Sequence, residues 1–254
     1  MLLAIDIGNT NIVFGIFEGK KNGKFLSSFR FETRHNRTAD EYFALFQPLF
    51  QKLNVKNKIT KVIISSVVPQ TDFEIESFCK KHLSINPTKV SEVKNKLNIE
   101  IKIDNPNELG ADRLVNAISA YDLIKKSCIV IDFGTATTFD VIDENGNYIG
   151  GVIASGVNLS IKALQEATSK LPKIAIKKPN KAIGKNTIEA MQAGVYYGYL
   201  GMVERIIDEI KSENKNIKKV IATGGLASFF KSKKIDLIDE NLTLKGLQII
   251  ADMV

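Results

Sequence analysis

The chain has 254 residues, of which 44% are hydrophobic and 25% charged, with a formal net charge of +7 and two cysteines. This length and composition allow one large globular domain or two of ordinary size. No apolar run approaches the length of a membrane span, and no basic segment precedes the first strand as in a secretory signal. Cys79 and Cys128 form neither a disulfide framework nor a metal-ligand spacing. We therefore expect a soluble cytoplasmic protein with no membrane partner.

The positive charge is nearly all lysine, and the lysines are spread along the chain. The denser groups lie within 170–185, 215–219 and 231–234, and no aromatic residues interleave the first of them. We interpret them as a solvated face and expect no nucleic-acid partner. Arginine is scarce, so Arg113, beside an acid in a glycine-containing segment, stands out.

The first hairpin organises the chain. An apolar run at 2–5 predicts a buried strand, Asp6 follows it, residues 7–10 predict a tight turn, and residues 11–17 predict a second strand. Such a hairpin holds one carboxylate beside the backbone N–H groups of a glycine-containing turn. That combination suits a nucleotide phosphate and its metal ion, because N–H groups bind phosphate oxygens and a carboxylate binds the cation.

The same arrangement returns half a chain later. An apolar run at 128–131 leads into the turn Asp132-Phe133-Gly134-Thr135, and a strand is expected over 136–142. Asp-x-Gly is also common in ordinary hairpin turns. Two copies at matched places, each after an apolar strand, favour an internal repeat and hence two similarly folded halves.

The remaining elements follow from apolar spacing and from capping residues. Strands are expected at 24–32, 61–68, 99–103, 148–154 and 219–222. Helices are expected from the capping box at Thr38, from Pro69, from near Asp112, over 157–169 and 186–213, after the glycine turn 223–226, and over 244–253. Small residues recur on the long helix at Ala193, Gly194, Gly198 and Gly201. We interpret them as a close helix–helix contact, for which a dimer interface is one candidate.

Asp112 and Arg113 lie near the start of their predicted helix. Neighbouring residues on a helix do not face each other, so the two side chains can point at different parts of one ligand. A second interpretation is that Asp112 only complements the helix dipole and that Arg113 is a surface residue.

Several motifs together resemble a known superfamily. Three of them resemble the two phosphate motifs and the adenosine motif of the acetate and sugar kinases, Hsp70 and actin: Asp6-Ile7-Gly8-Asn9-Thr10, Asp132-Phe133-Gly134-Thr135-Ala136-Thr137 and Thr223-Gly224-Gly225. Within that superfamily the chain resembles the type III pantothenate kinases. This narrower resemblance rests on Asp6 to Asn11, Gly110-Ala111-Asp112-Arg113-Leu114-Val115-Asn116-Ala117, the Gly150-Gly151 to Gly156 run and Gly184-Lys185-Asn186-Thr187. The match covers essentially the whole chain.

The resemblance implies an α/β protein of two ribonuclease H-like domains of actin/hexokinase type. Each would be a mixed five-stranded sheet with flanking helices, and the active site would lie in the cleft between them. We expect the domains to cover 1–116 and 117–254. The implied activity is ATP-dependent phosphorylation of pantothenate to 4'-phosphopantothenate, the first step of coenzyme A synthesis, by a homodimer.

The resemblance also implies roles for single residues. The ATP-binding residues would be Asp6, Ile7, Gly8, Asn9, Thr10, Asn11 and Thr135, with Asp6 near Mg²⁺. The substrate-binding residues would be Gly110, Ala111, Asp112, Arg113, Thr187 and the position of Ile103. Asp112 would be the catalytic base, and Asp132 would bind a monovalent cation, K⁺ or ammonium. Ile103 departs from the pattern, since many members have Tyr there, and a hydrogen bond to substrate is then absent or supplied elsewhere.

The chemistry agrees with these residue types. A primary alcohol needs one carboxylate to accept its proton, and the helix start is expected to keep Asp112 ionised. The planar fork of Arg113 matches the carboxylate of pantothenate. Two alternatives stay open: a non-catalytic, nucleotide-binding regulatory protein of the same fold, and a small-molecule kinase for another alcohol or acid. The presence of Asp6, Asp112 and Asp132 favours the enzyme.

Overall fold

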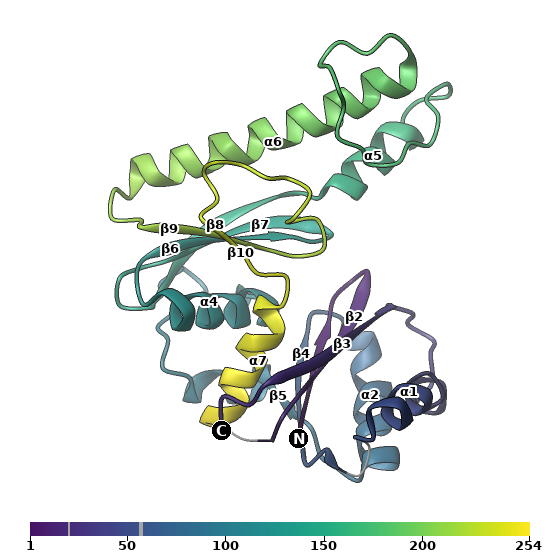
Figure 1. Ribbon diagram of the computed structural model, residues 1–254. Coiled ribbons are helices and arrows are strands. Elements are labelled where there is room, and N and C mark those ends of the chain that lie inside the picture. Colours follow the sequence, from purple (N-terminus) through teal and green to yellow (C-terminus); the bar gives the residue numbers. More distant parts are fainter. Residues whose placement is uncertain (20, 56–57) are drawn as a thin grey trace. The chain divides into compact units, whose positions relative to one another are not determined.

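The computed structural model describes residues 1–19, 21–55 and 58–254, which form two compact units (Figure 1). Unit 1 comprises Met1–Glu100, Asp104–Asp122 and Asn241–Val254, and unit 2 comprises Ile101–Ile103 and Leu123–Glu240. The expected ranges 1–116 and 117–254 differ from this division. The C-terminal segment joins unit 1 because its helix packs on the strands of that unit, and the boundary near 116 falls inside a helix.

Unit 1 contains a five-stranded mixed sheet in the order β3-β2-β1-β4-β5. Its strands are β1 (Leu2–Ile7), β2 (Asn11–Phe17), β3 (Phe25–Glu32), β4 (Lys61–Ser66) and β5 (Thr88–Lys89). β1, β2 and β3 are joined by antiparallel pairing, whereas β4 pairs parallel with both β1 and β5. The expected hairpin and the expected mixed sheet are therefore confirmed for this half.

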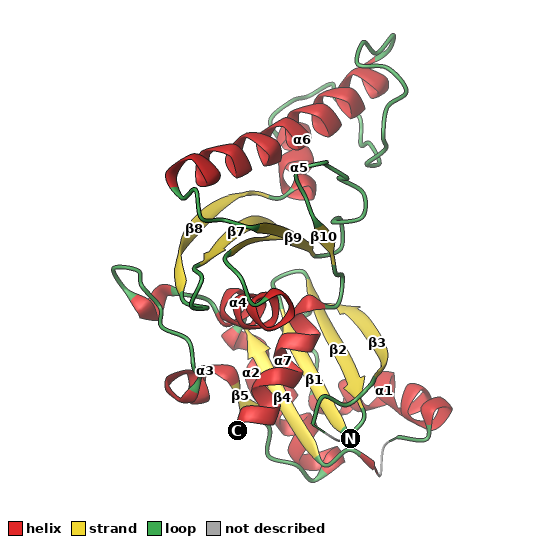
Figure 2. Ribbon diagram, turned by 60° about the vertical axis from the view of Figure 1, so that its left-hand side comes forward, coloured by secondary structure: helices red, strands yellow, loops and turns green. Residues whose placement is uncertain are grey.

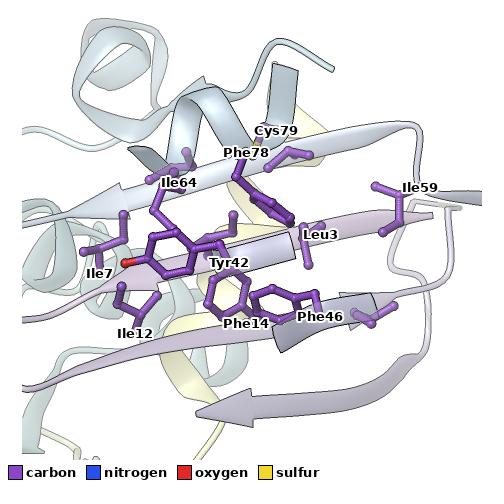
Figure 3. Packing of buried hydrophobic residues seen from close by; sticks show 14 of the residues in the cluster. Leu3, Ile7, Ile12, Phe14, Tyr42, Phe46, Ile59, Ile64, Phe78 and Cys79 are labelled. Atoms are coloured by element: carbon purple, nitrogen blue, oxygen red, sulfur yellow. The ribbon is translucent and has the colours of Figure 1, made fainter. Parts of the chain in front are cut away.

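The first face of the sheet holds the main core of unit 1. Helices α1 (Ala39–Leu53) and α2 (Pro69–Phe78) contribute Tyr42, Phe46 and Phe78, which pack with strand residues such as Phe14 (Figure 3). The capping box is confirmed: the Thr38 hydroxyl accepts from the Glu41 N–H and the Glu41 carboxylate accepts from the Thr38 N–H. A π-helical turn at Cys79–Leu83 continues α2, and short helices follow at α3 (Val90–Val93), Lys94–Lys96 and Pro106–Glu108.

The opposite face of the same sheet is covered by α7 (Leu242–Met253), which lies along β1 and β4 (Figure 2). Gly15 on β2 gives room to Leu244, since a Cβ there would lie 2.9 Å from the leucine methyl. α4 (Ala111–Ile124) in turn packs on α7, where a Cβ on Gly246 would lie 2.5 Å from the carbonyl oxygen of Val115. The C-terminal helix thus completes the N-terminal unit.

Unit 2 contains the second five-stranded mixed sheet, in the order β10-β9-β6-β7-β8. Its strands are β6 (Cys128–Phe133), β7 (Ala136–Ile142), β8 (Tyr148–Ser155), β9 (Lys219–Thr223) and β10 (Leu237–Ile238). Its core lies under α6 (Thr187–Glu213), whose N-cap Asn186 accepts a hydrogen bond from the Glu189 N–H. Helix α5 (Val157–Glu166) follows β8. Within the described residues, no helix is both long and apolar enough to cross a membrane.

Two expected elements are wrong. The strand at 99–103 is reduced to a single bridge from Ile101 to Tyr148, because no further strand pairs with it. The helix after the turn at 223–226 is absent over 226–230, where hydrogen bonds close only single turns while Ala227 and Phe230 are buried in the core. The helix expected over 157–169 ends at Glu166. The two-residue strands β5 and β10 are too short to show a period in sequence.

Candidate active site

The β1–β2 turn of unit 1 is held from outside by Thr33. The Thr33 hydroxyl donates to the Gly8 carbonyl at 2.6 Å, and the Thr33 N–H donates to the Thr10 carbonyl at 2.9 Å. The Gly8 N–H donates to the Asn11 carbonyl at 3.0 Å. Asp6 is half-buried at the end of β1, while Asn9 and Thr10 are exposed at the turn. Sequence reasoning missed Thr33, since nothing near it in sequence links it to the turn.

The second part of the unit 1 site is the start of α4. A Cβ on Gly110 would lie 2.6 Å from Oδ1 of Asp112 and 3.6 Å from a methyl of Val67. The Val67 N–H donates to the Ile7 carbonyl at 3.0 Å, immediately before Gly8. The fold therefore brings the expected substrate motif, with its neighbours Ala111 and Arg113, next to the end of β4, which pairs with β1. A side chain at position 110 would therefore have to displace the Asp112 carboxylate.

Burial raises the pKa of the Asp112 carboxyl above its ordinary value. The backbone N–H of Arg113, which donates to Oδ1 at 2.8 Å, and the charge of Arg113 act in the opposite direction, but desolvation is the larger effect. The helix start and Arg113 therefore favour the ionised carboxyl, as expected, but partial burial has the larger effect on its pKa. A raised pKa makes the carboxylate a stronger proton acceptor, as a general base requires.

The β6–β7 turn of unit 2 is surrounded by glycine backbone. The Gly134 N–H donates to the Ala136 carbonyl at 3.1 Å, and the Gly156 N–H donates to the Thr135 carbonyl at 3.1 Å. A Cβ on Gly156 would overlap that carbonyl and lie 2.6 Å from the Gly134 carbonyl oxygen. Gly224, at φ +90°, lies so close to Asp132 that a Cβ would be 2.5 Å from Oδ1. Thr135 itself is exposed at the turn.

Two other expected substrate residues also belong to unit 2. Thr187 is the exposed first residue of α6 and lines an open groove of about 830 Å³ between α5 and α6, together with Gly184 and Ser160. Ile103 follows Lys102, whose N–H donates to the Tyr148 carbonyl at 2.8 Å and whose Nζ donates to Asp143 at 3.2 Å. The structure therefore attaches Ile103 to the β7–β8 hairpin, outside the unit that holds Gly110 to Arg113.

Few side chains that could bind a metal ion lie close together in the part of the chain that the structure describes. Among the described residues, no three His, Cys, Asp or Glu side chains gather in a metal-binding cluster. A single carboxylate such as Asp6 fits Mg²⁺ that is held mainly by phosphate oxygens and water, which is the usual mode for this ion in kinases. Cys79 and Cys128 are buried free thiols, and burial raises the pKa of each to about 12, so neither is a metal ligand candidate.

The same fold occurs in solved structures of low sequence identity. The activator of 2-hydroxyisocaproyl-CoA dehydratase from Clostridium difficile, solved with bound ADPNP, is 12% identical with a TM-score of 0.54, covering 99% of this chain and 94% of that one. The ethanolamine utilization protein EutJ from Carboxydothermus hydrogenoformans is 15% identical with a TM-score of 0.54, covering 97% and 88%. At these identities the likeness shows the fold alone.

Relatives found by sequence share a much higher identity with this chain than these solved structures do. Proteins described as type III pantothenate kinase are 46% identical in Ruegeria pomeroyi, over 98% of this chain and 96% of the relative, and 46% identical in Myxococcus xanthus, over 98% and 97%. The relative from Gluconobacter oxydans is also 46% identical, over 99% and 93%. The family model for type III pantothenate kinase matches residues 2–209. The chain belongs to the type III pantothenate kinase family.

Proposed function

We propose that this protein phosphorylates pantothenate with ATP to give 4'-phosphopantothenate, the first step of coenzyme A synthesis. Family membership over the whole chain supports the reaction. The observation that carries the proposal is the half-buried Asp112, whose carboxylate lies beside Gly110 at the start of α4 and has a raised pKa. The buried thiols support a reducing, cytoplasmic location for the reaction.

ATP would be bound through both hairpins. The turn residues Ile7, Gly8, Asn9, Thr10 and Asn11 would bind phosphate oxygens, as would Thr135 of the second hairpin. Asp6 would hold Mg²⁺ through its carboxylate or through a bound water. When bound, Mg²⁺ neutralises charge on the phosphates during transfer. Thr33 supports this role indirectly, because its hydroxyl and its N–H donate to carbonyl oxygens of the first turn and so fix that backbone.

Asp112 would accept the proton of the pantothenate alcohol. As the alcohol oxygen forms its bond to the γ-phosphorus, the bond from that phosphorus to the bridging oxygen of ADP breaks and the alcohol proton passes to Asp112. Partial burial assists this step because it raises the pKa of the carboxyl and so makes it a stronger proton acceptor. Most of the remaining catalysis is positioning and charge stabilisation.

Arg113 would bind the carboxylate of pantothenate through its planar fork. Gly110, Ala111 and Thr187 would complete the substrate contacts, and Ile103, where many members have Tyr, would contribute only apolar contact. Replacing Arg113 with alanine is expected to raise KM for pantothenate more than it lowers kcat, because the lost contact is a binding contact. An equal effect on KM for ATP would contradict this role.

Asp132 would hold the monovalent cation, K⁺ or ammonium. Its carboxylate is half-buried beside the backbone of Gly224, and a carboxylate oxygen next to peptide groups is a suitable ligand for such an ion. A cation there would offset phosphate charge where the effective dielectric constant is low.

We also infer that the protein is a homodimer that pairs through the α5–α6 end of unit 2. Large apolar side chains are exposed there, namely Leu159, Leu164, Ile183, Ile188 and Tyr197. The glycines Gly194, Gly198 and Gly201 on α6 have open space where a side chain would be. Sedimentation velocity at micromolar concentration should give a dimer, and Gly198→Glu should give a monomer. A monomeric wild type would overturn this inference.

The test of the whole proposal is ATP consumption across pantothenate, hexoses and acetate. Turnover with pantothenate alone supports the proposed function. Turnover with another alcohol or acid supports a different small-molecule kinase. Nucleotide binding without turnover on any of them supports the regulatory alternative.

A further inference from the structure

Two buried hydroxyl groups in unit 1 have no hydrogen-bond partner among the described residues: those of Tyr42 and Ser65. Both residues are 0% exposed. A buried hydroxyl without a partner destabilises a fold, because its bonds to water are lost and not replaced. Such groups are few in native proteins, and each requires an explanation.

The two hydroxyls lie on opposite faces of the sheet. Tyr42 belongs to the apolar core under α1 and α2, and Figure 3 shows its hydroxyl pointing toward Ile7 within that core. Ser65 alternates with Ile64 on β4, and Ile64 faces the same core, so the Ser65 side chain points to the other face. That second face is the one that carries Asp6.

Ser65 is the direct neighbour of Asp6. In the parallel pairing of β1 with β4, Asp6 is matched with Ser65, and both side chains project from the same face of adjacent strands. Neighbouring strands are about 4.8 Å apart, so a serine hydroxyl can reach the adjacent carboxylate by rotating about χ1. Asp6 and Ser65 form the last matched pair on this face before the turn. Two residues earlier on β1, and on the same face, Ala4 is matched with Gly15, and Leu244 of α7 packs against Gly15.

The internal repeat places a hydroxyl beside the second hairpin acid as well. In unit 2, β6 pairs parallel with β9, and Asp132 is matched with Thr223. Thr223 is also buried, on the face opposite the core residues Val220 and Ala222. The two halves differ in most surrounding residues, yet both match a hydroxyl residue to the hairpin acid on the neighbouring parallel strand.

We propose that Ser65 is a positioning residue for Asp6 in the complex with Mg²⁺ and nucleotide. When one carboxylate oxygen of Asp6 turns to the cation or its water, the Ser65 hydroxyl donates to the other oxygen and fixes its orientation. The buried Ser65 hydroxyl, which has no partner among the described residues, is then the donor available for this bond. Groups that orient a metal-binding carboxylate in this way are worth roughly 10- to 100-fold in metal affinity. This inference rests on the proposed use of Mg²⁺ and nucleotide by the protein.

The test compares Ser65→Ala with wild type in two measurements. The first is the melting temperature without ligand, which should stay the same or rise, because the substitution removes an unpartnered buried hydroxyl. The second is the Mg²⁺ concentration that gives half of the MgADP-induced rise in melting temperature at fixed ADP. This concentration should increase about tenfold or more. ADP with a chelator should shift both proteins equally.

Tyr42→Phe is the matched control, since it removes the other orphaned hydroxyl from the face that does not carry Asp6. It should leave the Mg²⁺ requirement of the MgADP response unchanged. Ser65→Cys, which keeps the shape but offers only a weak donor, should fall between alanine and wild type in its Mg²⁺ requirement.

Three results would overturn the inference: an unchanged Mg²⁺ requirement in Ser65→Ala, an equal increase in Tyr42→Phe, or a large fall in melting temperature of ligand-free Ser65→Ala. The last would show that the hydroxyl already makes a structural bond, for example to a buried water. If wild type shows no response to MgADP at all, the proposed function itself fails. That result is distinguishable from a response that Ser65→Ala shares in full.

Discussion

The two hairpins that carry Asp6 and Asp132 have closely similar strands and turns. β1 and β6 have the same burial pattern, with five buried positions and a half-buried acid in fifth place, and β2 and β7 also share one pattern. The glycines of the two turns have matched surroundings. A Cβ on Gly8 would lie 3.2 Å from the Asn11 carbonyl oxygen, and one on Gly134 would lie 3.3 Å from that of Ala136.

The residues that surround the two hairpins differ. In unit 1 the neighbours are side chains: the Thr33 hydroxyl donates to the turn, and the Asp112 carboxylate lies beside Gly110 at the start of α4. In unit 2 the neighbours are the backbones of Gly156 and Gly224. The two repeated hairpins thus differ in their surroundings: a carboxylate, the proposed proton acceptor, follows in unit 1, whereas glycine backbone lies close to the turn in unit 2. We therefore expect equivalent substitutions in the two halves to have different consequences.

The largest effect is expected at Asp112, which has no counterpart beside the second hairpin. Asp112→Asn keeps the shape but cannot accept the alcohol proton, so kcat should fall roughly 10²- to 10⁴-fold, toward the lower end if the transition state is loose. The melting temperature at neutral pH should not fall, because the variant removes a charge that burial disfavours. The exposed Glu108→Gln is the matched acid-to-amide control. Normal turnover of Asp112→Asn would show that another group is the base.

The difference between the surroundings of the two hairpins could not be predicted from the sequence, whereas the hairpins themselves could. Both hairpins and the capping box at Thr38 follow from local spacing, and all are present in the structure. The pKa direction of Asp112 does not follow, because desolvation depends on packing by residues distant in sequence. The membership of α7 in unit 1 and the matching of Ser65 with Asp6 likewise depend on long-range pairing, which an amphipathic pattern does not specify.

The next largest effect is expected at Gly156, the glycine that touches the turn of unit 2. A Cβ would overlap the Thr135 carbonyl, so Gly156→Ala must displace the turn. A displacement of about 1 Å can cost up to 100-fold in activity, and we expect KM for ATP to rise at least tenfold. Gly8→Ala and Gly134→Ala, with matched and looser contacts, should have smaller effects that are similar to each other. If Gly156→Ala is no worse than these two, the backbone cradle is not needed for ATP binding.

The dependence of activity on monovalent and divalent cations should distinguish the role of Asp132 from that of Asp6. Wild type should turn over faster in potassium than in sodium buffer, and Asp132→Asn should lose this difference, because it removes the carboxylate proposed to hold the monovalent ion. Asp6→Asn should keep the ratio of the two rates while its Mg²⁺ requirement rises. Steady-state rates in the two buffers at equal ionic strength measure this. Equal rates of wild type in both buffers would remove the cation role from Asp132.

The smallest expected effect is a shift in pH dependence, and it concerns Asp112 of unit 1. A base must be ionised, so kcat/KM should fall as pH drops through the pKa of Asp112. Because burial raises that pKa, the fall should be centred above the ordinary aspartate value of about 3.9. The stability linkage has a definite sign. The folded state binds the proton more tightly than the unfolded state, so wild type should lose stability relative to Asp112→Asn as pH rises from the unfolded pKa through the folded pKa. Below the unfolded pKa the difference in stability between the two proteins should no longer change with pH. A melting-temperature difference that grows toward acid pH would mean that the carboxylate is stabilised in the fold, contrary to its burial.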